Sequence, residues 1–207
     1  SRPAKFDRSE VCKSTMLLFW QQGFNDTTIQ NIQLATGLTA SSLYNSFGGK
    51  EALFLIALDG YVERVVRRRC DQYLSNSSVT AGVMAYMRGC FKDRYAQWGC
   101  LLVNSQVEWR SLPEQARRRI NDAAEYVRES LEQAIEAGKS SGELINTVDA
   151  PAVARHLELL MQGLLARRRF EYRGAAMDAG DPKCCTTDEV EFLKIVSGVL
   201  QPLQVNR

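Results

Sequence analysis

The residues from Thr27 to Lys50, TTIQNIQLATGLTASSLYNSFGGK, decide how the rest of the chain is interpreted. Their spacing predicts two short helices joined by a tight turn. Thr28 offers a hydroxyl that can cap the first helix, and Gly37 follows where a helix end favours a residue that tolerates positive φ. Leu43 and Phe47 lie four residues apart, which places them on one apolar face of the second helix.

The polar face of the second predicted helix is suited to contacting nucleic acid, because hydroxyls and amides hydrogen-bond phosphate oxygens and base edges. The arrangement is typical of a helix-turn-helix, whose second helix enters the major groove. An ordinary helical hairpin with solvated polar faces is the alternative. We expect Thr28 and Lys50 to contact phosphates. The full set of predicted DNA contacts is Thr28, Thr39, Ser41, Ser42, Tyr44, Asn45 and Lys50.

A dense set of residues spans this motif and both of its flanks: Gly23, Phe24, Thr27–Ile29, Ile32, Ala35–Thr39, Ser42–Tyr44, Phe47 and Lys50–Leu53. This set closely resembles the DNA-binding domain of the TetR family of bacterial transcriptional regulators. The resemblance implies a regulator, usually a repressor, that binds operator DNA as a homodimer and is released by a small-molecule effector. Gln33 stands where the family usually has alanine, and Asn45 stands where an aromatic residue or histidine is common.

Composition and length indicate an ordinary globular protein. The 207 residues are 45% apolar and 24% charged, enough for one large domain or two small ones sharing a core. The longest apolar run, Ala52–Leu58, is far shorter than the ~20 residues that span a bilayer. No basic-then-apolar leader precedes it, so we expect no signal peptide and no membrane partner. The six cysteines are scattered without a disulfide or metal spacing, which favours a reducing, cytoplasmic location.

The small net charge of +2 is concentrated near the N-terminus. Residues 1–74 hold 9 Lys or Arg against 7 Asp or Glu, whereas residues 75–207 hold 17 of each. A homodimer would double this local excess. Arg2, Lys5 and Arg8 form a basic arm that can follow phosphates or reach the minor groove, or that is simply a solvated terminus.

Helical spacing recurs along the whole chain, and no strand is predicted. We expect an all-α fold with a three-helix helix-turn-helix DNA-binding domain over residues 1–49 and a helical ligand-binding and dimerisation domain over residues 50–207. Loops are expected at 138–142 and 173–182. Leu160 and Leu193, with Gly163 and Gly198 beside them, are expected at the dimer interface. The predicted helices cover residues 8–22, 29–36, 40–47, 50–74, 79–98, a segment around 104, 113–137, 149–171 and 186–202.

The family resemblance also implies an effector cavity beside the long helix that begins at Lys50. Aromatic and aliphatic residues of four predicted helices suit an apolar or amphipathic effector. The candidate lining residues are Tyr61, Tyr86, Cys90, Phe91, Trp98, Cys100, Trp109, Leu157 and Met161.

Enzymatic chemistry finds no support in the sequence. There is no nucleophile elbow, phosphate-binding loop or metal cluster, and the single histidine, His156, lies beside an apolar seam where a structural role is expected. We therefore predict that the chain is not an enzyme and needs neither cofactor nor metal.

A chemical reaction at Cys100 is the alternative to effector binding as the signal that releases the DNA. Cys100 follows Gly99 at a helix junction, where a helix N-terminus would favour the thiolate, although a buried structural thiol is the other interpretation. The segment Trp98–Asn104 resembles a TetR subgroup that includes electrophile- and redox-responsive repressors. The competing hypothesis is a helical interaction or redox-sensing protein in which the DNA-binding motif is degenerate. Redox or electrophile sensing would act through Cys100, whereas the vicinal pair Cys184 and Cys185 lies in a predicted loop.

Overall fold

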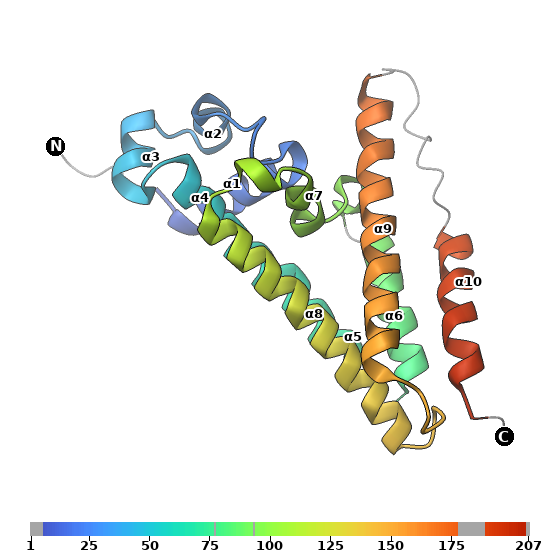
Figure 1. Ribbon diagram of the computed structural model, residues 1–207. Helices are drawn as coiled ribbons and strands as arrows, with labels where there is room; N and C mark the ends of the chain where they lie inside the picture. The colour runs from blue at the N-terminus through green and yellow to red at the C-terminus, as the bar shows by residue number, and fades with distance from the viewer. Residues whose placement is uncertain (1–5, 77, 93, 178–188, 206–207) are drawn as a thin grey trace.

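The computed structural model describes residues 6–76, 78–92, 94–177 and 189–205, with the backbone alone over 172–177. The regular structure of these ranges is helical, and the only β-type pairing described in them is an isolated bridge between Leu144 and Gln204. A small unit of three helices lies at one end, and longer helices extend away from it as a bundle (Figure 1). The predicted all-α class is confirmed.

The three-helix unit consists of α1 (Arg8–Gln22), α2 (Ile29–Thr36) and α3 (Ala40–Phe47). Phe19, Ile32 and Leu43 are completely buried between them, so each helix contributes its apolar side to one small core. These bounds agree with the helices predicted from the sequence. The first helix ends at Gly23, as its position after the apolar run indicated.

The caps of α2 and α3 form as their hydroxyl residues predicted. The Asn31 backbone N–H donates to Thr28 Oγ1 at 3.1 Å, and the Asn31 side chain accepts from the Thr28 backbone N–H at 2.8 Å, which completes a capping box. The Ser42 backbone N–H donates to Thr39 Oγ1 at 3.2 Å. Because both helices have only eight residues, these caps satisfy a large share of their free backbone donors.

The helix after the motif is continuous but contains an irregular stretch. It begins as α4 (Lys50–Tyr61), widens into a π-helical segment, η1 (Val62–Arg67), and ends as α5 (Arg68–Leu74). The sequence predicted one helix over this whole span and gave no sign of the π segment. π segments are rare and occur mostly at functional sites.

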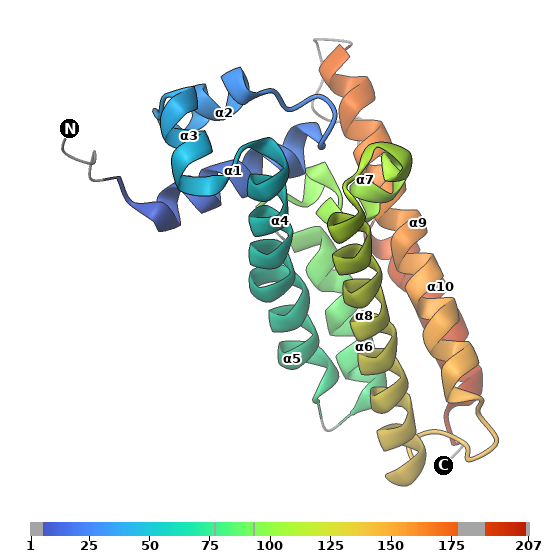
Figure 2. The same cartoon turned by 60° about the vertical axis from the view of Figure 1, so that its left-hand side comes forward.

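The remaining helices build the bundle. In Figure 2, α4–α5, α6, α8 and α9 run side by side while α1 lies across one end of them. The elements are α6 (Val79–Lys92), η2 (Ala96–Trp98), α7 (Leu101–Val107), η3 (Trp109–Ser111), α8 (Glu114–Ser140), α9 (Ala150–Met177), α10 (Glu189–Leu200) and η4 (Gln201–Leu203).

Three predicted boundaries were wrong. The helix expected over 79–98 ends at Lys92, and only a short 3-10 turn follows. Helix α8 continues to Ser140 through part of the expected loop, because Gly138 is buried against Val79 and Leu144 and leaves no room for a larger residue. Helix α9 also continues into the expected loop at 173–182. The predicted caps of the last helix lie outside the described residues.

Candidate functional site

The outward face of α3 presents a row of polar side chains. Ser41, Tyr44 and Asn45 are exposed, while Leu43 and Phe47 turn into the core of the three-helix unit. The Tyr44 side chain is 56% exposed, unusually high for a large aromatic residue. The structure therefore brings together on one short helix the donors and acceptors that can reach base edges.

Three predicted contacts beside that face have partners within the protein. Ser42 is half-buried, and its hydroxyl lies 3.0 Å from Thr39 Oγ1. Thr28 Oγ1 is engaged in the capping box of α2. A helix end of this kind still offers backbone N–H groups and a favourable dipole to a phosphate. Contacts of these residues with DNA stay predictions.

Lys50 is oriented toward the body of the protein. Its Nζ donates to the Asn25 carbonyl oxygen at 3.5 Å and lies 4.4 Å from the centre of the Phe24 ring. Burial lowers the pKa of the Lys50 ammonium, although the carboxylates of Glu108, Asp26 and Glu51 oppose this. The Lys50 ammonium therefore makes contacts at the junction between the three-helix unit and the bundle. The sequence did not indicate these contacts.

Glu108 holds the loop between α1 and α2. Its Oε2 accepts the Phe24 backbone N–H at 2.7 Å, and its Oε1 accepts the Asn25 backbone N–H at 3.0 Å. Gly23, which has a φ of 90°, lies next to the Glu108 carboxylate. A Cβ added to Gly23 would come within 2.9 Å of Glu108 Oε2. One carboxylate that follows α7 thus positions the loop that leads into the helix-turn-helix. Sequence analysis missed this contact because the residues are more than 80 positions apart.

Trp20 makes a second connection across the same junction. Its indole Nε1 donates to the Gly99 carbonyl oxygen at 3.1 Å, and its own carbonyl oxygen accepts from Arg169 Nη1 at 3.3 Å. Arg169 is buried on α9, a rare position for a guanidinium unless it is paired. The C-terminal end of α1 is therefore held by the segment before α7 and by α9. We call Trp20, Gly23, Gly99, Glu108 and Arg169 the junction residues.

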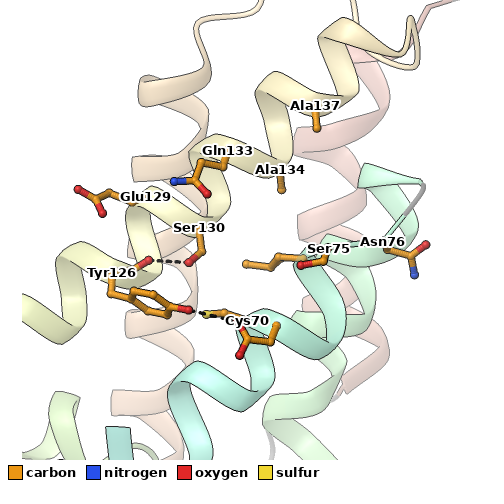
Figure 3. A pocket seen from close by; sticks show the side chains of 11 residues that line it. Cys70, Ser75, Asn76, Tyr126, Glu129, Ser130, Gln133, Ala134 and Ala137 are labelled. Atoms are coloured by element: carbon orange, nitrogen blue, oxygen red, sulfur yellow. Dashed lines mark hydrogen bonds between the residues drawn. The ribbon is translucent and has the colours of Figure 1, made fainter. Parts of the chain in front are cut away.

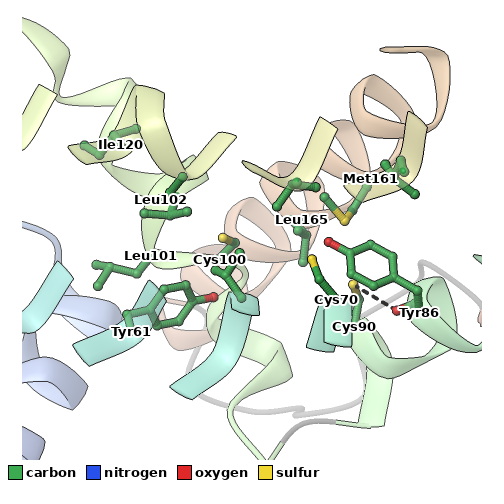
Figure 4. Packing of buried hydrophobic residues seen from close by; sticks show 14 of the residues in the cluster. Tyr61, Cys70, Tyr86, Cys90, Cys100, Leu101, Leu102, Ile120, Met161 and Leu165 are labelled. Atoms are coloured by element: carbon green, nitrogen blue, oxygen red, sulfur yellow. Dashed lines mark hydrogen bonds between the residues drawn. The ribbon is translucent and has the colours of Figure 1, made fainter. Parts of the chain in front are cut away.

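A small cavity lies inside the bundle beside η1, with a volume of about 50 Å³. Tyr61, Tyr86, Cys100 and Met161 line it, as the sequence predicted, and Figure 4 shows them converging from four elements of the bundle. Val65 and Val66 of the π segment contribute to the same wall. The cavity thus touches the helix that leads to the helix-turn-helix unit.

Five predicted lining residues do not reach this cavity. Leu157 and Cys90 are buried in the core, and the Phe91 ring packs at 5.7 Å from that of Phe192. Trp98 stacks on Tyr95 with ring centres 4.6 Å apart. Trp109 is half-buried in the turn η3. Helical periodicity identified these residues as inward-facing, but it could not distinguish a cavity wall from packed core.

Two charged lining residues were missed. Arg69 and Glu158 both line the cavity, although runs of charge in helices are usually solvated. The run Arg67–Arg69 would be expected to form a solvated face, but Arg69 is half-buried and its Nη1 donates to Cys90 Sγ at 3.5 Å. Glu158 is only 4% exposed, whereas the neighbouring His156 is exposed rather than structural. The only available signal was their helical spacing from apolar neighbours.

The cysteines within the described residues are free thiols in apolar surroundings. Cys70, Cys90 and Cys100 are buried, and Cys12 is half-buried. Burial raises the pKa of the Cys70 and Cys90 thiols, which disfavours the reactive thiolate. The predicted pair at 184 and 185 lies outside the described residues.

A wider hollow opens on the bundle surface between α5 and α8, with a volume of about 350 Å³ (Figure 3). Polar groups surround it, and the Tyr126 hydroxyl lies 3.3 Å from Asp71 Oδ1. Arg67 covers the Tyr126 ring at 4.3 Å.

Over the described ranges, neither a metal-binding group of three or more His, Cys, Asp or Glu nor a helix long and apolar enough to cross a membrane is found.

Comparison with known proteins agrees with this geometry at both ends of the chain. Residues 12–57 match the family model described as "Bacterial regulatory proteins, tetR family", and residues 79–180 match that described as "Tetracyclin repressor-like, C-terminal domain". The chain belongs to the TetR family. It is a TetR-type transcriptional regulator with a helix-turn-helix DNA-binding unit, as the sequence resemblance implied.

Relatives and solved structures extend the likeness over most of the chain. The HTH-type transcriptional repressor ComR of Escherichia coli is 27% identical over 182 residues, 86% of this chain and 85% of ComR. The repressor AcnR of Corynebacterium efficiens is 24% identical over 77% of this chain and 80% of AcnR. A cysteine mutant of CifR, bound to 26-bp operator DNA, has a TM-score of 0.78 at 21% identity and covers 98% of this chain and all of that one. Reduced NemR of E. coli has a TM-score of 0.73 at 20% identity over 96% of this chain and 97% of its own.

Proposed function

We propose that this TetR-family chain is a transcriptional repressor that binds operator DNA as a homodimer and is released by a small-molecule effector in the bacterial cytoplasm. The observation that carries the proposal is the exposed row Ser41, Tyr44 and Asn45 on a capped recognition helix. The repressor names of ComR and AcnR and the operator complex of CifR support it. Membership of a regulator family also supports a non-enzymatic role.

The dimer surface is proposed on the outward sides of α9 and α10. Leu159 is 57% exposed and Ile195 is 50% exposed, an uncommon exposure for large aliphatic residues on two neighbouring helices. Gly163 and Gly198 have open space where a side chain would stand, so a second protomer can approach closely. Leu193, which the sequence suggested for this interface, is instead buried in the protomer's own core.

Transmission is proposed to run from the cavity through η1 and α4 to the recognition unit, with the junction residues as its second route. An effector shifts the balance only if it binds one arrangement better than the other. The cavity touches both η1 and α7, and Glu108 follows α7 directly. Filling the cavity would therefore move the two elements that hold the helix-turn-helix unit in place.

Thiol chemistry at Cys100 is the second candidate trigger, because Cys100 lines the same cavity at the start of α7. Replacing Cys100 by serine separates the two mechanisms. A response to electrophiles that disappears in Cys100→Ser would favour thiol chemistry, whereas a retained response leaves reversible effector binding.

A gel-shift assay on genomic DNA fragments at several salt concentrations tests the proposal. We expect a discrete complex whose affinity falls as salt rises, because each phosphate contact releases a counterion. The paired substitution Leu159→Glu and Ile195→Glu should produce a folded monomer with weak DNA binding. A dimer that persists in sedimentation would assign the interface to another surface, and absence of any discrete complex would refute the DNA-binding function.

A further inference from the structure

The Glu158 carboxylate is the least satisfied polar group of the cavity wall. Its Oε1 accepts from Gln162 Nε2 at 2.9 Å. Its Oε2 is buried and has no hydrogen-bond donor within the described part of the chain. Arg155 Nη1 lies 3.6 Å from Oε2, beyond hydrogen-bonding distance, and the Arg155 side chain is 57% exposed to water.

A half-satisfied carboxylate in this position is energetically unfavourable. Burial raises the pKa of the Glu158 carboxyl, and the positive charges of Arg155 and Arg128 only partly oppose this. A buried acceptor that lacks a donor loses its hydration without compensation, and the loss is greater when the acceptor is charged. Such a group gains most from a ligand that brings its own donor.

The other charged group of the cavity is already engaged. The Arg69 guanidinium is protonated, as guanidinium groups in proteins always are, and its Nη1 donates to Cys90 Sγ at 3.5 Å. This donor is therefore occupied within the protein. The open position in the cavity is therefore an acceptor, and it calls for a positively charged donor rather than an anion.

The rest of the wall specifies the body of the ligand. Val65, Leu102, Val127, Met161 and Leu165 supply aliphatic surface. Tyr61 and Tyr86 add aromatic rings, which also attract cations. At about 50 Å³ the cavity has room for little more than a small polar group. A larger apolar body would have to displace η1 and α7, which also line it, and this is the movement that the proposed function requires.

We propose that the effector is an organic amine, with an apolar body held among the aliphatic and aromatic side chains and an ammonium group that donates to Glu158 Oε2. This inference rests on the proposed function, because it names the chemical class of the effector that would release the DNA. Glu158 would then favour positively charged ligands, and the apolar wall would limit the size of the ligand.

Three probes of one skeleton test the assignment: 2-phenylethylamine, 2-phenylethanol and 3-phenylpropionate, titrated at pH 7 by calorimetry into the full chain. We expect the amine to bind at least ~10-fold more tightly than the alcohol, and the carboxylate to bind more weakly still. Glu158→Gln should weaken amine binding by roughly 10- to 100-fold, the range expected for a charged hydrogen bond, and change alcohol binding by less than about threefold.

Two further variants guard against misfolding and indirect effects. Glu158→Asp keeps the charge but withdraws it by one methylene, so its amine affinity should lie between those of wild type and Glu158→Gln. Arg118→Gln removes an exposed ion pair with Glu114 that does not line the cavity, and it should leave amine binding unchanged. All variants are compared by circular dichroism and thermal melting before titration.

Several outcomes would overturn the amine assignment. Equal affinity for the amine and the alcohol, no binding of any probe, or an undiminished preference in Glu158→Gln would each show that water alone satisfies Oε2. A gel shift separates this failure from failure of the proposed function. Wild type that binds DNA but is not released by the amine refutes the effector class only, whereas wild type that never binds DNA refutes the repressor itself.

Discussion

The outward face of α3 and the cavity beside η1 present their polar groups to a ligand in opposite ways. The face of α3 exposes its polar side chains to water and fixes their positions through the backbone caps at Thr28 and Thr39. The cavity buries its polar groups and leaves one of them, Glu158 Oε2, without a donor. An exposed site thus depends on rigid placement, whereas a buried site can depend on an unsatisfied group that a ligand completes.

The junction residues stand between these two regions and join them. Glu108 binds backbone N–H groups of the loop after α1, and Arg169 binds a backbone carbonyl near the C-terminal end of α1. The comparison therefore predicts three kinds of variant: those that remove DNA binding alone, those that disturb the connection, and those that destabilise the bundle without affecting DNA binding.

The largest effect is expected at the recognition face. The double variant Tyr44→Ala and Lys50→Ala should weaken operator binding by about 100-fold, because base-edge and phosphate contacts contribute about 1–3 kcal/mol each. The thermal midpoint should fall only slightly, because Tyr44 is 56% exposed and Lys50 contributes one long hydrogen bond and one ring contact at the junction. Gel shift and differential scanning fluorimetry measure the two quantities. Lys92→Ala, which removes an exposed charge from the end of α6, is the control. Unchanged affinity in the double variant would remove α3 from the DNA interface.

An intermediate effect is expected at Gly23. Alanine there must adopt φ of 90° and also meet Glu108 Oε2 at 2.9 Å, so we expect a loss of about 2–4 kcal/mol in the free energy of unfolding together with weaker DNA binding. Gly142 is a control for a positive φ without a collision, because its φ is 73° and no atom lies within 4 Å of an added Cβ. Gly23, at φ 90° and ψ 178°, imposes additional backbone strain on alanine.

Urea unfolding of both alanine variants, alone and combined with Glu108→Ala, isolates the contribution of the collision. Gly142→Ala should cost only about 1 kcal/mol. Removing Glu108 should lower the cost of Gly23→Ala by the part that comes from the collision, and it should leave the cost of Gly142→Ala unchanged. An unchanged cost of Gly23→Ala in that background would mean that the collision with Glu108 contributes nothing to it.

The smallest effect is expected at the far end of the bundle, where Glu143 caps α6. Burial alone would raise the pKa of the Glu143 carboxyl, but hydrogen bonds from Thr80, Val79 and Ser78 outweigh it and hold the pKa below the usual 4.5. A depressed carboxyl pKa adds stability that is complete above pH 4.5 and is lost as the pH falls through the folded-state value.

Glu143→Gln should therefore lower the free energy of unfolding by about 1 kcal/mol at pH 7, a typical value for a helix cap, and by progressively less as the pH falls below 4.5. Thermal melts across this pH range measure the difference. DNA affinity at pH 7 should stay within about twofold of wild type. A pH-independent difference would mean that the ionised carboxylate is not what stabilises the cap.

Much of the fold could be predicted from local pattern. The bounds of α1, α2 and α3 were correct because capping residues, glycines and apolar spacing act within a few residues of each other. The errors came where distant packing overrode a local signal. Gly138 indicated a loop, yet it lies inside α8 because Val79 and Leu144 leave no room for a side chain.

The candidate cavity was predicted only in part. Apolar periodicity indicated Tyr61, Tyr86 and Met161, since a residue that faces inward on a helix has a characteristic spacing, and Cys100 was indicated by its position at a predicted helix junction. The same spacing selected Leu157 and Phe91, which pack in the core. Whether an inward side chain meets another side chain or an empty volume depends on the partner helices, and the spacing within one helix carries no information about them.

The sequence by itself determined the helical class, the recognition unit with its caps, and the membership of a DNA-binding regulator family, because those features arise from short-range backbone preferences and a compact motif. Only the tertiary structure decided which charges are buried. Glu158 and Arg69 occur within ordinary charged helical stretches, and Glu108 meets Phe24 across more than 80 residues of chain. The electrostatic character of a site depends on distance in space and on exclusion of water, and both exist only once the helices have packed together.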